Sequence, residues 1–271
     1  MLTIADNLNA ATPLVAAALA ARDADAITGL ALRLRDAGAD ALDLNLGFRS
    51  RGASETAAWL VRHVWEATAL PLCIDTADPH TMRAGMAAAD ALGAVPMPII
   101  NSFSLESRKI EQILPLAAEY GTPIVGYCVR DVVPQTPEER LEVAVELVEL
   151  ADAAGVPRHR LYLDPILFPL ATFQDDFAHV LAFFEALPQL FDPPVRTMAA
   201  LSNVGHGLPA AKRRVVEGTV LPMLAALGVD AVLLNVLDPQ LRDILTVLRA
   251  AEGCMVFSGA DLAADDRGGG D

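Results

Sequence analysis

The feature that most constrains this chain is a regular alternation of eight short apolar segments with longer helical ones. The apolar segments predict β-strands at residues 2–5, 41–46, 70–74, 97–100, 123–129, 161–163, 197–201 and 231–236. The other segments predict helices at residues 23–37, 54–68, 79–91, 107–120, 137–154, 176–187, 210–227 and 239–251. Such continuously apolar strands are typical of parallel strands that helices cover. Eight units in 271 residues predict a single closed (β/α)₈ TIM barrel, a fold of about 250 residues.

Residues typical of helix ends support this reading. Glycines suited to the left-handed conformation that ends a helix stand at Gly38, Gly121, Gly155 and Gly228. Helix starts are predicted at Ser54, Ser107, Thr136 followed by Pro137, and Asp238 followed by Pro239. No linker-like stretch interrupts the pattern. We therefore expect one barrel domain over residues 1–260 and a disordered, glycine-rich tail over residues 261–271.

Charge and composition exclude several classes of function. The net charge of −15 disfavours binding to the phosphate backbone of nucleic acids. No apolar run is long enough to cross a membrane, and residues 1–5 lack the pattern of a signal peptide. Cys73, Cys128 and Cys254 show no paired spacing, which fits a reducing compartment. We expect a cytoplasmic protein with neither nucleic-acid nor membrane partners.

Polar side chains recur where the predicted strands end, which is where TIM barrels place their active sites. These residues are Asn7, Asn9, Asp43, Asn45, Asp75, Asn101, Asp164, Ser202, Asn203 and Asn235. A single one would be an ordinary turn or cap residue, and Asn7 and Asn235 fit that interpretation equally well. Their recurrence around the barrel predicts a cavity lined by amides and a few carboxylates.

The residue types narrow what such a cavity binds. No His or Lys stands at a strand end, so we expect no metal site, and no Ser or Cys forms a nucleophile elbow. A phosphate site in such a barrel needs glycine-rich loops with Lys or Arg after the seventh and eighth strands. Gly205 and Gly207 supply only part of this pattern, so a phosphate ligand is less favoured but stays open. Carboxylates and amides together can pair with the adjacent donors and acceptors of a planar heterocycle. A pterin fits this cavity best.

Five short stretches carry a resemblance to a known family. They are Ala-Leu-Asp-Leu-Asn-Leu-Gly at 41–47, Leu-Cys-Ile-Asp-Thr at 72–76, Ile-Asn-Ser at 100–102, Leu-Tyr-Leu-Asp-Pro at 161–165 and Leu-Ser-Asn-Val at 201–204. Through them the chain resembles the methyltetrahydrofolate:corrinoid methyltransferases, which share the pterin-binding barrel of dihydropteroate synthase. It is also similar to the folate-binding module of cobalamin-dependent methionine synthase. The resemblance covers roughly residues 2–257.

The resemblance implies roles for the residues at the strand ends. Asp75, Asn101 and Asp164 would hold the pterin ring, and Asn203 would be catalytic, near the nitrogen that carries the methyl group. The remaining substrate-binding positions are Asp43, Asn45, Asn9, Ser202 and Asn235. The methyl group would pass between methyltetrahydrofolate and the cobalt of a corrinoid (cobalamin) held on a partner protein. The family also implies a homodimer.

The chain departs from the family in places, and other functions stay open. The family often opens with Glu-Arg-x-Asn, of which Asn9 alone clearly corresponds here, and Phe103 stands where a second Asn is common. A role for His206, in a glycine-flanked loop, is undecided. The alternatives are a dihydropteroate synthase-like enzyme and a non-catalytic pterin-binding protein. The synthase would show a late Ser-Arg-Lys stretch, whereas Lys212, Arg213 and Arg214 here lack that context.

Overall fold

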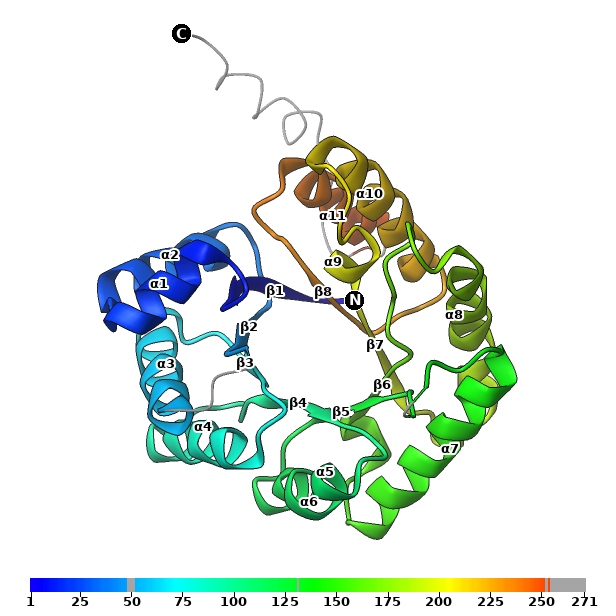
Figure 1. The fold of residues 1–271 in the computed structure, drawn as a ribbon, viewed down its shortest axis with the longest axis horizontal. Coiled ribbons are helices and arrows are strands. Elements are labelled where there is room, and N and C mark those ends of the chain that lie inside the picture. Colours follow the sequence, from blue (N-terminus) through cyan, green and yellow to red (C-terminus); the bar gives the residue numbers. More distant parts are fainter. Residues whose placement is uncertain (48–51, 131, 252, 254–271) are drawn as a thin grey trace, which may run out of the picture.

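A computed structural model describes residues 1–47, 52–130, 132–251 and 253. Its centre is a closed barrel of eight parallel strands, hydrogen-bonded in chain order with β8 returning to β1 (Figure 1). The strands are β1 (Leu2–Asn9), β2 (Ala41–Asn45), β3 (Leu72–Asp75), β4 (Ile99–Phe103), β5 (Ile124–Tyr127), β6 (Leu161–Asp164), β7 (Arg196–Ala200) and β8 (Ala231–Leu234). The predicted (β/α)₈ barrel is confirmed, with each strand within a few residues of its expected place.

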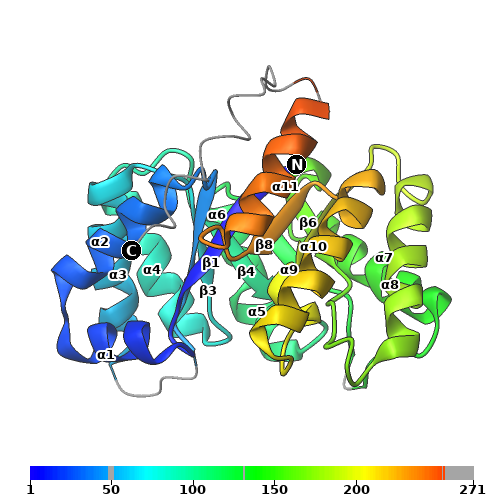
Figure 2. The same cartoon turned by 90° about the horizontal axis from the view of Figure 1, so that it is seen from above.

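Helices surround the barrel on all sides, as the two views show (Figures 1 and 2). They are α1 (Pro13–Ala21), α2 (Ala24–Asp36), α3 (Ala53–Thr68), α4 (Pro79–Ala91), α5 (Ser107–Gln112), α6 (Leu114–Glu119), α7 (Pro137–Ala153), α8 (Gln174–Ala186), α9 (Leu201–Val204), α10 (Ala210–Ala226) and α11 (Pro239–Ala251). Two short 3₁₀ turns, η1 (Arg158–Arg160) and η2 (Leu187–Gln189), precede β6 and β7. The eight predicted helical segments are confirmed.

Three helical details differ from the sequence-based expectation. The segment 107–120 is two helices, because Pro115 has no backbone N–H with which to continue the first one. Helix α1 was not predicted, since its nearly uniform apolar sequence has no polar face to reveal the period of a helix. The predicted seventh strand included Leu201, but β7 ends at Ala200 and Leu201 opens the short helix α9.

The expected helix-end residues are partly confirmed. Gly38, Gly121, Gly155 and Gly228 all have positive φ after a helix, as predicted. The Thr136 side chain accepts the backbone N–H of Glu139, so it caps α7. The Asp238 carboxylate accepts the N–H of Gln240 and so caps α11. Ser54 and Ser107 are not the caps, because Gly52 and Glu106 occupy the cap positions of α3 and α5.

Two separate apolar cores hold the barrel together. The larger one lies between the strands and the surrounding helices and contains most of the buried Leu, Val and Phe side chains. The smaller one fills the inside of the barrel and consists of Ile4, Ala41, Cys73, Ile99, Val125, Tyr162, Met198, Ala231 and Leu233. Every strand contributes to this inner core, so it fixes which side chains of each strand point inward.

Close packing of α4 on β3 fixes the loop that follows β3. A Cβ atom at Gly85 of α4 would lie 2.9 Å from Cδ1 of Ile74, so any larger residue there would force the end of the Ile74 side chain to move. The α4 cap residue, Asp78, accepts the backbone N–H of Thr81 at 2.9 Å. These contacts hold the connection between Asp75 and Asp78 in one place.

Other expectations fall partly outside the described residues. Cys73 and Cys128 are buried free thiols, as expected of core positions. Cys254 and the predicted tail at residues 261–271 lie outside the described part of the chain. Among the described residues, no helix combines the length and apolar character that a membrane span requires.

Candidate active site

The inner face of the barrel changes from apolar to polar toward the carboxyl ends of the strands. Side chains two residues apart on a strand point to the same face, so each inner-core residue predicts where the next inward side chain lies. The next residues inward are Asp6, Asp43, Asp75, Asn101, Tyr127, Asp164, Ala200 and Leu233. Six of these eight are polar, and they form a polar layer above the apolar inner core. The catalytic end of a TIM barrel is this carboxyl end.

The register of β2, β3 and β4 aligns three predicted site residues in one row. Asn45 pairs with Asp75, and Asp75 pairs with Asn101. The side-chain amide of Asn45 donates a hydrogen bond to Oδ2 of Asp75 at 2.5 Å. The other side of the Asn45 amide, its Oδ1, accepts the backbone N–H of Gly47 at 3.0 Å. Asn45 is therefore held at both ends, and it holds the carboxylate of Asp75 in turn.

The β4–β6 side of the layer contains Tyr127, which the sequence reading did not include. Its hydroxyl donates to Oδ1 of Asn101 at 2.9 Å. Tyr127 pairs in register with Asp164, whose Oδ1 accepts the backbone N–H of Ile166 at 2.7 Å. Ile166 has φ of 59°, a left-handed conformation that a β-branched residue rarely adopts. Such conformations persist where the surrounding structure fixes them and are common at functional sites.

A cavity of about 860 Å³ opens beside this layer, over the ends of β2, β3, β4 and β5. Asn45, Asp75, Asn101, Ser102 and Tyr127 form the part of its wall that belongs to the barrel. The rest of the wall consists of Gly47, Gly52, Ala53, Ser54, Glu55, Thr76, Ala77, Asp78, His80, Thr81, Arg108 and Lys109. Three predicted substrate-binding residues therefore line one cavity. Its volume falls in the range of small-molecule binding sites.

Burial raises the pKa values of the carboxyl groups in the polar layer. Desolvation raises the pKa of Asp164 to about 7, although the Ile166 N–H and the Arg140 charge oppose the rise. Desolvation likewise raises the pKa of Asp75 to about 6, against the Asn45 hydrogen bond and the Lys109 charge. The pKa of Asp43 is raised well above its usual value, by burial first and then by the Asp75 charge. Carboxyl groups in this state can hold a proton near neutral pH and can donate as well as accept hydrogen bonds.

Asp43 lies on β2 two residues before Asn45 and pairs in register with Cys73. Its side chain is buried, and its Oδ1 has no hydrogen-bond partner among the described residues. The Cys73 thiol and the Asn101 amide lie near enough to lower its pKa, against the larger effect of burial. A buried oxygen without a partner is costly unless a proton, a water molecule or a ligand satisfies it. Asp43 is not among the residues that line the cavity.

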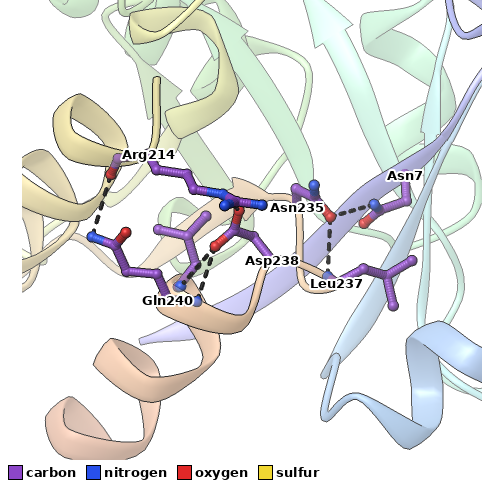
Figure 3. Close-up of polar contacts among 7 residues, drawn as sticks. Asn7, Arg214, Asn235, Leu237, Asp238 and Gln240 are labelled. Carbon is purple, nitrogen blue, oxygen red and sulfur yellow. Dashed lines mark hydrogen bonds and ion pairs between the residues drawn. The ribbon is translucent and has the colours of Figure 1, made fainter. Parts of the chain in front are cut away.

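A second polar cluster lies where β1 and β8 end. The side-chain amide of Asn7 donates to Oδ1 of Asn235 at 2.6 Å, and that oxygen also accepts the N–H of Leu237 at 3.0 Å (Figure 3). Asp238 forms an ion pair with Arg214 at 2.9 Å in the same region. Asn235 thus fixes the start of the loop after β8. This supports the interpretation of Asn7 and Asn235 as residues that stabilise their loops.

The remaining predicted site residues lie around the mouth of the barrel, away from the cavity. The Oδ1 of Asn9 accepts the N–H of Ala11 at 2.8 Å, so Asn9 forms a turn at the end of β1. Asn203 lies on α9 with an exposed side chain that has no hydrogen-bond partner in the described part of the chain. Ser202 lies close enough to Asp6 to lower the pKa of that carboxyl. His206 is exposed in the next loop.

Two further acidic residues of this region were not predicted from the sequence. Burial raises the pKa of Asp6, on the inner face of β1. Burial also raises the pKa of Glu217, on α10, to about 7, and the Arg213 charge opposes the rise. The Glu217 side chain packs closely against Gly205, where a Cβ atom would lie only 2.7 Å from its Oε1. Asp6 and Tyr127 could have been found by continuing each strand's inward-facing pattern by two residues, whereas nothing in the sequence marks Glu217.

The chain is similar to known proteins over most of its length. The sequence profile of the family described as pterin binding enzyme matches residues 7–235. The chain is 28% identical over 258 residues to the methylcorrinoid:tetrahydrofolate methyltransferase of Eubacterium limosum, which covers 94% of this chain and 91% of that protein. It is 24% identical over 208 residues to the methionine synthase of Mycobacterium tuberculosis, which covers 73% of this chain but only 17% of that protein.

Solved structures with the same fold include two dihydropteroate synthases. The enzyme from Xanthomonas albilineans, solved with 4-aminobenzoic acid, has a TM-score of 0.70 and 24% identity, covering 93% of each chain. The enzyme from Yersinia pestis, solved with a pterine-sulfa conjugate, has a TM-score of 0.69 and 18% identity, covering 93% of this chain and 94% of that one. At these identities the likeness concerns the fold of the barrel.

Proposed function

Since this chain belongs to the pterin-binding enzyme family, we propose that it is a methyltransferase that acts on tetrahydrofolate and a corrinoid. The methyl group would move between N5 of the folate and the cobalt of a corrinoid that a partner protein carries. The match with a methylcorrinoid:tetrahydrofolate methyltransferase over almost the full length of both chains favours this reaction. The dihydropteroate synthases share the fold at lower identity and do not by themselves argue for their own reaction.

The observation that carries the proposal is the row formed by Asn45, Asp75 and Asn101 along one wall of the cavity. A pterin presents an amino group next to a ring N–H, and a carboxylate can accept a hydrogen bond from each. In the proposed complex Asp75 accepts these two hydrogen bonds, and the Asn101 amide pairs with the remaining polar edge. Tyr127 fixes the orientation of that amide through its 2.9 Å hydrogen bond.

The chemistry requires control of one proton. A methyl group leaves N5 readily only when that nitrogen carries a proton, so that the C–N bonding electrons remain on a neutral amine. In the opposite direction N5 attacks the methyl on cobalt, the Co–C electron pair stays on cobalt, and N5 gives up its proton. Asp164, whose pKa is raised to about 7, can exchange such a proton near neutral pH. Asn203 follows β7 and lies outside the cavity wall, and it is from the family resemblance that we propose it to hydrogen-bond N5 as the charge on N5 changes.

No protein nucleophile is needed in this scheme. The cobalt attacks the methyl group in one direction, and the folate nitrogen attacks it in the other. The chain's part is to hold the pterin, to exclude water from N5 and to regulate its proton. Carboxyl groups that keep their protons near neutral pH and well-oriented amides are suited to that part.

Two measurements test the proposal together. Purified protein should bind methyltetrahydrofolate in calorimetry, and it should convert free cob(I)alamin to methylcobalamin when that folate is supplied, as followed by the cobalamin spectrum. A protein that binds neither methyltetrahydrofolate nor tetrahydrofolate is not this enzyme. Condensation of pterin pyrophosphate with 4-aminobenzoate would favour the synthase alternative. Binding without either reaction would favour a non-catalytic pterin-binding protein.

The proposal includes the partners expected from the sequence. A separate corrinoid protein would dock over the mouth of the barrel, and the active protein would be a cytoplasmic homodimer. Sedimentation of the purified chain at micromolar concentration tests the dimer. Capture of a cobalt-containing protein from the native cell, competed by free cobalamin, tests the corrinoid partner.

A further inference from the structure

The cavity is larger than the pterin row needs. Asn45, Asp75, Asn101, Ser102 and Tyr127 form its barrel end, and the rest of its wall consists of loop residues after β2 and β3 and of the starts of α3, α4 and α5. A volume of about 860 Å³ suits a drug-sized ligand rather than one pair of fused rings. The cavity therefore has an outer arm, lined by Ala53–Glu55 of α3, His80 and Thr81 of α4, and Arg108 and Lys109 of α5.

Among the residues that the structure describes, two cations line this outer arm, in a chain whose net charge is −15. The side chain of Lys109 is only 13% exposed, and its ammonium lies 2.9 Å from Oε1 of Glu106. The side chain of Arg108 is 58% exposed, and its Nη2 lies 3.0 Å from Oδ1 of Asp78. Lys109 is also close enough to Asp75 to lower the pKa of that carboxyl. The positive charge thus begins beside the pterin end and extends outward.

Both cations have donors to spare for a ligand. An ammonium has three N–H donors and a guanidinium has five, and each cation here has one short contact with a carboxylate. The side chain of Glu106 is 62% exposed and that of Asp78 is 39% exposed, so water screens these two ion pairs and weakens them. The first turn of α4 is already capped by Asp78, so an anion in this arm would be held by the two side chains. Glu55 and Asp78 also line the cavity, and their negative charges disfavour an anion anywhere in the arm except beside the two cations.

We propose that Arg108 and Lys109 form the subsite for the anionic tail of the folate, with the ligand's glutamate carboxylates as the groups they bind. This inference rests on the proposed function, because it takes the pterin to lie at Asp75. A folate is a pterin joined through an aminobenzoyl group to one or more glutamates. With the ring on the Asn45–Asp75–Asn101 row, the outer arm is the part of the cavity that remains for the tail, and it is the part with cations.

The test compares two ligands that differ in the tail. Methyltetrahydrofolate carries it, and 5,6-dimethyltetrahydropterin lacks it. Calorimetry would give the dissociation constant of each for the wild type, Arg108→Gln, Lys109→Gln and the double variant. The control is Arg83→Gln, which removes an equal charge from an exposed ion pair with Glu119 outside the cavity wall.

The expected result is a loss specific to the tail. Each single variant should weaken methyltetrahydrofolate binding roughly 3- to 10-fold relative to dimethyltetrahydropterin, and the control should change neither. The preference of the wild type for the tailed ligand should shrink as salt is added, and a second glutamate on the tail should increase it. Since Arg108 is mostly exposed, its variant should keep the fold, and far-UV circular dichroism checks this for every variant.

Failure of the inference is distinct from failure of the proposed function. A wild type that binds both ligands equally, or a double variant with the wild-type ratio of the two constants, overturns the tail subsite and leaves the pterin site standing. A wild type that binds neither ligand overturns both. The salt and diglutamate measurements use the unmodified protein, so the answer does not depend on any variant folding.

Discussion

The side-chain amide of Asn45 on β2 donates a hydrogen bond to the carboxylate of Asp75 on β3, with 2.5 Å between Nδ2 of Asn45 and Oδ2 of Asp75. This bond joins residues thirty positions apart in the chain because the two strands pair in register at this point. It leaves Oδ1 of Asp75 available on a cavity wall. Burial raises the pKa of Asp75 to about 6, so the carboxyl is largely ionised at pH 7 and can accept hydrogen bonds from a pterin.

Asp75→Ala should weaken the binding of methyltetrahydrofolate about tenfold or more. The variant loses hydrogen bonds to a charged acceptor, each of which typically contributes about 1.5–3 kcal/mol. Calorimetry on folded protein measures the effect. Asp243→Ala, on the exposed side of α11, is the matched control for the loss of one charge. Equal affinities for the Asp75 variant and the wild type would remove Asp75 from the site.

Asn203→Ala should slow methyl transfer on the order of 100-fold while methyltetrahydrofolate still binds. An interaction that strengthens as charge changes on N5 affects the rate more than the affinity when it is lost. Asn203 does not cap α10, whose cap position is Pro209, so the substitution should leave the free energy of unfolding nearly unchanged. Stopped-flow transfer to cob(I)alamin measures the rate. A wild-type rate in the variant would end the catalytic assignment of Asn203.

The free energy of unfolding of the ligand-free protein should decrease as the pH rises from about 5 to about 8. The pKa of Asp164 is near 3.8 in an unfolded chain and about 7 in the folded one, so the folded state binds the extra proton between these values. Its stabilising effect is therefore complete below about pH 4 and is lost as the pH passes 7. One such proton contributes a slope of at most about 1.4 kcal/mol per pH unit.

Asp164→Asn isolates the contribution of this residue. The variant cannot titrate at that position, so urea unfolding at pH 5, 6, 7 and 8 should show a shallower dependence than the wild type. Asp243→Asn, at an exposed site, should keep the wild-type slope. If Asp164→Asn and the wild type gave the same slope, Asp164 would not hold a proton in the folded protein at pH 6.

Arg140→Met should destabilise the fold by about 3–5 kcal/mol. Arg140, in the first turn of α7, is fully buried, and its Nη2 lies 2.8 Å from Oδ1 of Asp176 on α8. The substitution leaves Asp176 as a buried charge without its partner, which is the costly way to break such a pair. Replacing both residues, as Arg140→Met with Asp176→Leu, should recover much of the loss. Urea unfolding of the three proteins and the wild type gives the double-mutant cycle.

The Arg140 variant has a second expected effect, which a purely structural role would not produce. The Arg140 charge lowers the pKa of Asp164, so its removal should raise that pKa above about 7. The pH at which transfer activity changes should move upward by the same amount. An unmoved pH profile in folded Arg140→Met protein would separate Arg140 from the site.

The alternation of apolar and helical segments was enough to predict the closed barrel. The helix ends at Gly38, Gly121, Gly155 and Gly228 could also be predicted, because a positive φ after a helix strongly favours glycine. Asp75 and Asn101 could be predicted at the carboxyl end of the barrel because each directly follows an apolar segment that was predicted as a strand. In these cases the cause lies within a few residues of the position itself, so the sequence contains it.

Only the tertiary structure decided which of these residues meet. The Asn45–Asp75 bond depends on strand register, and the Arg140–Asp176 pair depends on two helices packing side by side. The cavity lies over β2 to β5, so Asn203 and Asn235 at the other strand ends do not line it, while Arg108 and Lys109 do. Strand register and helix packing depend on many weak contacts between segments that are far apart in the chain. A local sequence pattern does not show which of these contacts form. The sequence therefore determined the barrel and its polar end, and the packing of the loops and helices around that end decided the shape and charge of the cavity.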